Sequence, residues 1–436
     1  MDAGQLAAWA ATTHPVYAHP HALAVPATLD ELQAIVRAAR RHRMEVVAIS
    51  RGRNIGLGGR IPPMARGRPL IIDLQLFRGI RAIDERFGTV ALEPGVTFED
   101  LHAALRQRNS RWFLPVTGGP PNGSVIGNLL QRGDGTGPFG DRARAFLDLE
   151  AVLKSGELVS TCRDAAGPDM SGLFFQSEAG VVTAVTLSLV QLPAVMTRFV
   201  LRLQHGVGVG RLVDTAQAAT RDGILPPGAV CMWNGTKRVV RFGGSESSEG
   251  WAMSGAMHAA SLRRAEADWL DLEAALATSG LDIEVLHHET VKEPKGVGLL
   301  EGEPSDANLV SIMSGLTGPT GAPGFTWVCP VMPFDGRAAE EVSRLASEEL
   351  AVAGIPPNLA LGCRDGRTIR GYIALAWDRS DTAAEARALH AHDRLVARFD
   401  AAGLPQFRLG QLSRDWSPHR GDTARVLARL MQALAA

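Results

Sequence analysis

The alternation of apolar and polar positions predicts helices and short strands in the first part of the chain. Apolar residues recur at helical spacing over Leu29–Ala39, directly after Thr28, which is a favourable helix N-cap. The apolar runs Val46–Ile49 and Leu70–Leu74 predict buried strands, and Phe98–Arg106 has the pattern of a second helix. This mixture predicts an α+β layer in which the loops between strands are free to hold a ligand.

The pattern changes after about residue 193, which predicts a second domain. Strand candidates here are Phe199–Leu203 and Val239–Phe242, and longer helix candidates are Gly250–Ser279 and Gly336–Ala353. We expect an antiparallel sheet with helices on it, forming a cap or substrate domain. The expected division is a two-part ligand-binding domain over residues 1–195 and a cap over 196–404. Residues 405–436, with a helix at Asp422–Ala435, are expected to return to the first domain.

Composition narrows the class of protein and its partners. At 436 residues, with 45% hydrophobic and 21% charged residues, the chain has the content of an ordinary globular protein. A net charge of −1 gives no reason to expect a nucleic-acid or membrane partner, and no run approaches the ~20 apolar residues of a membrane span. The four cysteines lack CxxC spacing and the histidines lack ligand spacing, so we expect free thiols in the cytoplasm and no metal site.

The segment Ser50–Gly59 carries the clearest chemical signal. It follows the first strand candidate and places four glycines between positions 52 and 59. Glycine adopts positive φ and leaves no side chain between its N–H group and a ligand, so such a loop forms an amide nest for an anion, commonly a pyrophosphate. The spacing fits neither the GxGxxG fingerprint of a nicotinamide-binding fold nor the Gly-Lys-Ser/Thr of a nucleotide triphosphatase.

An ordered series of further segments follows this glycine loop. The segments are Leu70–Leu74, Ile83-Asp84, Val90–Thr97, Ser124–Asn128, Arg132-Gly133, Gly137–Asp141, Glu150–Leu158, Gly172–Ser177 and Gly180–Thr183. In this order they resemble the FAD-binding domain of the vanillyl-alcohol oxidase / p-cresol methylhydroxylase family, almost continuously from about Pro26 to Pro193 and more weakly to about Asp415. The resemblance implies FAD as the cofactor and an FAD-dependent oxidase or dehydrogenase as the activity.

The resemblance also assigns residues to the cofactor. Backbone amides of the glycine loop are expected to hold the pyrophosphate, with Asn54 pinning the loop, and Val182 lies on the strand expected along the adenine side. For Arg132 an ordinary surface or ion-paired arginine remains an equal alternative. The expected cofactor-binding residues are Arg51, Gly52, Arg53, Asn54, Ile55, Gly56, Gly58, Gly59, Ser124, Gly127, Asn128, Arg132, Gly133, Gly137, Gly180 and Val182.

Asp141 is the expected catalytic acid–base residue. In the matching segment of the oxidases that this chain resembles, the acid lies near flavin N5 and can take a proton from the substrate. Partial burial of a carboxylate raises its pKa, which suits a base near neutral pH. The alternative is a loop aspartate that only accepts backbone N–H bonds. Asp134, where the family commonly has an apolar residue, is a second acid without an assigned role.

The substrate pocket departs from the family pattern. Phenol-oxidising members hold the phenolate with two tyrosines and an arginine; Leu57 and Phe407 occupy the tyrosine positions here, and only Arg408 remains. The loss of two hydroxyl donors puts a phenol substrate in doubt, whereas an arginine on an apolar floor suits a carboxylate, another oxyanion or a carbonyl. Leu57, Trp327 and Phe407 are then expected as apolar pocket wall, and Arg408 as the group that orients the substrate.

Two further departures concern the flavin. Phe325 stands where many relatives attach FAD covalently through a histidine, so non-covalent FAD is expected, with Cys329 as the remaining candidate for a linkage. The family's positively charged C-terminal segment has no counterpart before Ala436. Arg408, Arg414 or Arg420 is expected to take its place near the flavin.

These features lead to one main functional hypothesis and two alternatives. The main one is hydride transfer from an activated C–H of a small molecule (an alcohol, amine or hydroxy acid with an anionic or carbonyl group) to flavin N5, with reoxidation by oxygen or a redox partner. The alternatives are a para-alkylphenol or vanillyl-alcohol oxidase with a rearranged pocket, and a non-catalytic binding or subunit protein that retains the fold. A homodimer is compatible with all three hypotheses.

Overall fold

The computed structural model describes most of the chain. The described residues are 12–14, 19–60, 67–162, 166–177, 179–203, 208–235, 250–307, 309–310, 323–412, 426, 429–430 and 433. No helix among them is long and apolar enough to cross a bilayer.

The first helix forms where the sequence predicts it. Helix α2 (Leu29–Arg41) begins at Thr28, whose side chain accepts a hydrogen bond from the Glu31 N–H, and ends in a basic turn that matches the helix dipole. Its buried face packs on a small parallel sheet of order β1-β3-β2. The strands are β1 (Ala22–Ala24), β2 (Glu45–Ile49) and β3 (Pro69–Asp73).

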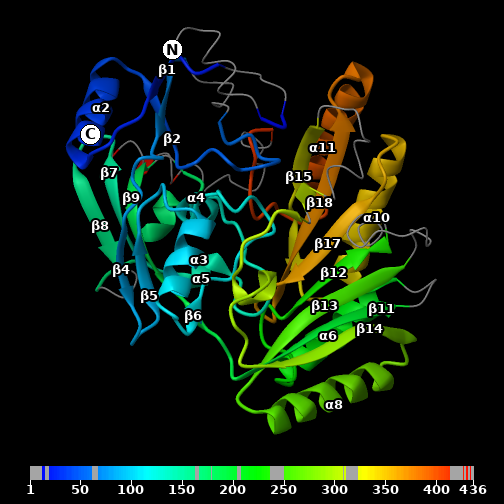
Figure 1. Ribbon diagram of the computed structural model, residues 1–436. Helices are drawn as coiled ribbons and strands as arrows, with labels where there is room; N and C mark the ends of the chain where they lie inside the picture. Colours follow the sequence, from blue (N-terminus) through cyan, green and yellow to red (C-terminus); the bar gives the residue numbers. More distant parts are fainter. Residues whose placement is uncertain are drawn as a thin grey trace.

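A five-stranded antiparallel sheet of order β4-β5-β9-β7-β8 completes the first part of the molecule (Figure 1). Its strands are β4 (Ile80–Asp84), β5 (Thr89–Leu92), β7 (Phe146–Leu153), β8 (Leu158–Cys162) and β9 (Gly180–Ser188). Helix α3 (Phe98–Gln107) contributes to the same core, and Thr97 with Asp100 forms a complete capping box at its start. Shorter elements are β6 (Trp112–Phe113), α4 (Val125–Leu130), α5 (Arg142–Ala145), η1 (Ser171–Phe174) and β10 (Val190–Gln191).

The second part is built on an eight-stranded sheet of order β14-β11-β13-β12-β17-β18-β15, with β16 paired to β18. The strands are β11 (Val195–Leu203), β12 (Val230–Asn234), β13 (Trp251–Ala259), β14 (Ile283–Lys292), β15 (Pro323–Val328), β16 (Val331–Pro333), β17 (Asn358–Cys363) and β18 (Thr368–Asp378). These strands pair antiparallel with their neighbours, as expected for a cap domain.

In the described part of the chain, four helices cover one face of this sheet, which leaves the other face toward the first part of the molecule (Figure 1). They are α6 (Val209–Arg221), α8 (Leu262–Thr278), α10 (Gly336–Val352) and α11 (Thr382–Ala401); a short turn, η2 (Leu299–Glu301), follows β14. The expected α+β class, with a cap of antiparallel sheet and helices, is confirmed.

One predicted element is wrong and others lie outside the described residues. The segment Gly250–Ser279 is strand β13 followed by helix α8, and not one helix. Its first nine residues read as helix because Ala and Met are good helix formers, but pairing to β11 and β12 on both sides fixes them as a strand. The predicted strand Val239–Phe242 and most of the predicted helix Asp422–Ala435 are not among the described residues.

Candidate functional site

A cavity of about 1660 Å³ lies between the two parts of the molecule. It is larger than one drug-sized ligand needs, so it has room for a dinucleotide and a substrate together. One wall is the glycine loop with segments 117–137 and 174–182, and another is the uncovered face of the eight-stranded sheet. The segment 406–411 closes a third side.

The sheet wall follows from strand alternation. Along each strand, every second side chain packs under the helices, and the side chains between them face the cavity. Five adjacent strands each contribute a cavity-side residue, and all of these except Tyr372 are small or medium-sized. They are Val200, Cys231, Ser254, Ala360 and Tyr372, and the alternate residues buried under the helices are Leu201, Met232, Met253, Leu361 and Ile373.

The glycine loop has the backbone that a pyrophosphate nest requires. Gly52, Gly56 and Gly58 all have φ between 60° and 77°, a region that favours glycine. A Cβ on Gly56 would lie 2.6 Å from Trp327 and 2.8 Å from Phe325, so the bare backbone is also needed for contact with strand β15. The loop therefore docks on the cap by close backbone approach.

The structure places most expected cofactor-binding residues on the cavity wall and sets three behind it. Gly56, Gly58 and Gly133 are not among the lining residues, and each instead allows a neighbouring side chain to approach the backbone closely. Those that line the cavity are Arg51, Gly52, Arg53, Asn54, Ile55, Gly59, Ser124, Gly127, Asn128, Arg132, Gly137, Gly180 and Val182.

Sequence reasoning missed the residue that supports this loop from behind. His14 is fully buried against Gly58, and burial lowers its pKa to about 4, so the ring is neutral at physiological pH. Its neighbour Thr13 accepts a hydrogen bond from the Gly56 N–H at 3.2 Å and donates to the Phe325 carbonyl at 3.1 Å. A short stretch near the N-terminus thus ties the loop to the cap, a contact that no local pattern indicates.

Asp141 lies behind the cavity wall in this structure and is not among its lining residues. It is the N-cap of α5, where its side chain accepts from the Ala143 N–H at 3.1 Å. Its carboxylate also pairs with Arg370 at 3.5 Å and with Arg144 at 3.8 Å. These contacts fit the structural alternative that the sequence left open.

Asp134, which had no assigned role, lines the cavity. Its carboxylate accepts a hydrogen bond from the Tyr372 hydroxyl and pairs with Arg370, both on strand β18. The sequence gives one indirect signal for this cluster, because residues two apart in a strand share a face. Nothing local connects them to Asp134.

Phe407 joins the cluster to the apolar wall. Its ring meets Tyr372 edge-on with centroids 5.7 Å apart, and the Arg370 guanidinium lies 4.9 Å from its centre. Leu57, Trp327 and Phe407 all line the cavity. The aromatic position next to Arg408 is therefore filled, and Tyr372 of strand β18 lies beside it.

Several polar atoms on the wall are buried without a partner in the described part of the chain. On the short segment 406–411 they are Gln406 Nε2, Arg408 Nε and Gln411 Oε1, and on the cap it is Arg364 Nε. Buried polar groups in proteins are normally hydrogen-bonded, so unpaired atoms along one cavity indicate a polar ligand. Together with the amide nest, they fit FAD and a polar substrate.

The attachment position expected from relatives offers no nucleophile. Phe325 is fully buried and packs edge-on against Trp327, with ring centroids 4.7 Å apart. Cys329 lines the cavity, and its carbonyl accepts the Phe407 N–H at 3.0 Å. The described residues contain no group of three or more His, Cys, Asp or Glu side chains arranged to hold a metal ion.

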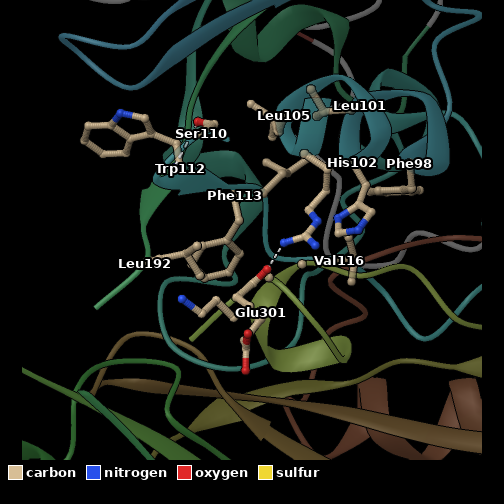
Figure 2. A pocket seen from close by; sticks show the side chains of 15 residues that line it. Phe98, Leu101, His102, Leu105, Ser110, Trp112, Phe113, Val116, Leu192 and Glu301 are labelled. Atoms are coloured by element: carbon tan, nitrogen blue, oxygen red, sulfur yellow. Dashed lines mark hydrogen bonds between the residues drawn. The ribbon is translucent and has the colours of Figure 1, made fainter. Parts of the chain in front are cut away.

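A second cavity of about 30 Å³ lies between helix α3 and residues 295–302 (Figure 2). It has room for little more than a water molecule, so we assign it no ligand. The adjacent Glu301 is buried, pairs with Arg198 and accepts the Val297 N–H at 2.9 Å. These contacts hold the segment after β14 against strand β11 of the eight-stranded sheet.

Comparison with known proteins supports the cofactor assignment. Residues 20–161 match the FAD binding domain family. The chain is 28% identical to 1'-carboxy-chondrochloren decarboxylase of Chondromyces crocatus, over 94% of this chain and 86% of that protein. It is 25% identical to the 4-cresol dehydrogenase [hydroxylating] flavoprotein subunit of Pseudomonas putida, over 48% of this chain and 43% of that protein.

A solved structure shows the fold along the whole chain. The crystal structure of p-cresol methylhydroxylase with substrate bound superposes with a TM-score of 0.85 at 19% identity, covering 99% of this chain and 91% of the other. FAD is thus the cofactor that the nest, the unpaired polar atoms and the comparisons agree on. The chain is an FAD-dependent oxidoreductase that resembles the vanillyl-alcohol oxidase / p-cresol methylhydroxylase family and has the fold of p-cresol methylhydroxylase.

Proposed function

We propose that the protein oxidises a small molecule that carries a carboxylate or carbonyl group, by hydride transfer to FAD. The observation that carries this proposal is Arg408, whose Nε is buried at the cavity wall without a partner in the described part of the chain. A guanidinium in this state favours an oxyanion, because charge-assisted hydrogen bonds are stronger than neutral ones. Bound FAD supplies the two-electron acceptor for such an oxidation.

The surrounding side chains define how this substrate is held. Arg408 binds its anionic or carbonyl oxygen, and the wall of Leu57, Trp327 and Phe407 excludes water from the reacting carbon. Asp141 contributes through Arg370, with which it pairs, instead of touching the substrate. In this proposal oxygen or a redox partner reoxidises the flavin.

A second candidate is the same oxidation followed by loss of the carboxylate. The relative that aligns over 94% of this chain is named a decarboxylase. In such a step, hydride leaves the carbon next to the carboxylate-bearing carbon, the C–CO₂ bond breaks and its electron pair forms a C=C bond. The products are an alkene, CO₂ and the two-electron-reduced cofactor, so no further oxidant is needed.

The test is anaerobic bleaching of the flavin by matched compounds. We expect mandelate, which carries a carboxylate, to reduce the FAD at lower concentration than benzyl alcohol, which lacks one. Arg408→Gln is expected to raise the mandelate concentration for half-reduction by roughly 10- to 100-fold, the range for a lost hydrogen bond to a charged group. The exposed Arg387→Gln is the matched control and should leave it unchanged.

Other outcomes distinguish the alternatives. Equal reduction by both compounds, or no effect of Arg408→Gln, contradicts the carboxylate site. Reduction by 4-hydroxybenzyl alcohol alone supports the phenol-oxidising alternative, and a flavin that no compound reduces supports the binding-protein alternative. CO₂ released from 3-phenylpropanoate supports decarboxylation.

We further propose that FAD is held without a covalent bond, because Phe325 provides no nucleophile where many relatives carry a histidine. Acid precipitation of the purified holoprotein is then expected to release the yellow colour into the supernatant. Colour that stays in the pellet contradicts this, and Cys329→Ser would show whether Cys329 forms the linkage.

A further inference from the structure

The hydroxyl group of Tyr372 is already hydrogen-bonded within the protein. It donates its single proton to Asp134, whose other carboxylate oxygen pairs with Arg370. Arg370 is fixed in turn by Asp141 at 3.5 Å and by the Phe407 ring. Hydrogen bonds to a carboxylate are roughly twice as strong as neutral ones, so turning this proton toward a ligand is unfavourable.

Tyr372 therefore faces the cavity as an acceptor. A phenol oxygen has one proton and two lone pairs, and with the proton directed at Asp134 only lone pairs remain for a ligand. Burial and the nearby Asp134 charge raise the pKa of Tyr372 well above its usual range, so the hydroxyl stays protonated. The side chain cannot serve as a phenolate-stabilising donor, although it is a tyrosine in the expected part of the pocket.

Arginine side chains line the same cavity at positions separate from the Tyr372 hydroxyl. Arg132 and Arg364 line the same cavity, and the Arg364 guanidinium lies over Gly362, where a Cβ would come within 2.5 Å of it. One Arg364 Nη donates to the Gly135 carbonyl at 2.9 Å, whereas its buried Nε has no partner in the described part of the chain. Anionic groups have these guanidiniums and Arg408 to bind, which leaves the Tyr372 oxygen for a neutral donor.

We propose that Tyr372 and Asp134 form a hydrogen-bond acceptor in the cavity wall that selects a substrate with a neutral O–H or N–H group. The inference rests on the proposed function in that this substrate also carries the oxyanion bound by Arg408. The substrate class is thus a bifunctional molecule, with an anionic group and, separately, a hydroxyl, amine or amide donor.

The first test uses phenol and anisole, which share a ring and are both neutral at pH 7, but only phenol donates a hydrogen bond. Binding to the FAD-loaded protein is followed by the flavin spectrum and by calorimetry. We expect phenol to bind the wild type roughly tenfold more tightly than anisole, the upper range for one neutral hydrogen bond. Tyr372→Phe keeps the ring and should reduce this preference to within about twofold. A wild type that does not prefer phenol, fails to bind it, or keeps the preference in Tyr372→Phe overturns the proposal.

The second test asks whether Asp134 directs the proton. The probe is the 4-nitrophenolate anion at pH 8.5, which accepts hydrogen bonds. In the wild-type background Tyr372→Phe should change its affinity by less than about twofold, because the hydroxyl has no proton to offer. In the Asp134→Leu background, where that proton is free, the same substitution should cost roughly tenfold. Equal effects in both backgrounds overturn the proposal, and the phenol–anisole comparison decides alone if Asp134→Leu does not fold. Neither test uses a carboxylate, so this inference and the proposed function fail separately.

Discussion

Gly56→Ala is expected to lower the affinity of the protein for FAD by at least about 30-fold. Alanine at φ +77° carries a backbone cost of about 1–2 kcal/mol, and a Cβ 2.6 Å from Trp327 adds typically about 1–3 kcal/mol of overpacking. The loop cannot shift to relieve this contact. Its Gly56 N–H is bonded to Thr13, and its carbonyl accepts from the Thr326 hydroxyl at 3.2 Å and from the Trp327 N–H at 3.3 Å.

Measurement of the FAD dissociation constant on the apoprotein, by quenching of flavin fluorescence, checks this prediction. Gly172→Ala is the matched control, because a Cβ there meets nothing within 4 Å and its φ is not in the left-handed region. The control should bind FAD as the wild type does. An unchanged dissociation constant in Gly56→Ala contradicts the role of the loop backbone.

Arg142→Ala is expected to destabilise the protein by about 3–5 kcal/mol, the usual cost of removing one partner from a buried charged network. Arg142 is 2% exposed, and donates to the Asn128 side chain at 2.6 Å and to the Pro115 carbonyl at 2.8 Å. Burial lowers its pKa to about 10, so it remains charged at pH 7 beside Asp134 and Asp141. Loss of Arg142 leaves the Asn128 side chain and the Pro115 carbonyl without their hydrogen-bond donor. It also removes the positive charge beside the carboxylates of Asp134 and Asp141.

Urea unfolding at pH 7 with saturating FAD measures the effect as a lower midpoint at an unchanged slope. Arg144→Ala on the same short helix is the control. Its side chain is 60% exposed, and its surface ion pair with Asp365 at 3.1 Å is worth less than about 1 kcal/mol. A loss of stability as small in Arg142→Ala as in the control would show that the network under α5 does not hold the cavity wall.

The glycine loop shows how far sequence reasoning reaches at the cofactor site. The order of residues along the chain is enough to predict an amide nest. Such a nest is made from consecutive backbone N–H groups and needs only glycines after a strand. Most of the cofactor-binding residues expected from this loop and the following segments line the cavity. The comparisons independently match an FAD binding domain to residues 20–161.

The substrate side shows the limit of the same reasoning. The sequence placed an apolar wall and Arg408 in the pocket and expected Asp141 as the base. In the structure Asp134 lines the cavity in its place, paired with Arg370 and Tyr372 from a strand more than two hundred residues away. The helix predicted over strand β13 was wrong, because the helix-favouring composition of these residues is overridden by pairing to two neighbouring strands.

The sequence by itself indicated the α+β class and the amide nest, because these depend on local backbone geometry. It indicated FAD through the family resemblance of an ordered run of segments. Only the tertiary structure decided which charged groups meet at the cavity. Asp134, Tyr372 and His14 act through neighbours that are distant in the chain, and burial and pairing arise when two separately built sheets enclose one cavity. Local sequence patterns indicate which residues are apolar, but they do not indicate which hydrogen-bond donor each buried oxygen meets in the folded protein.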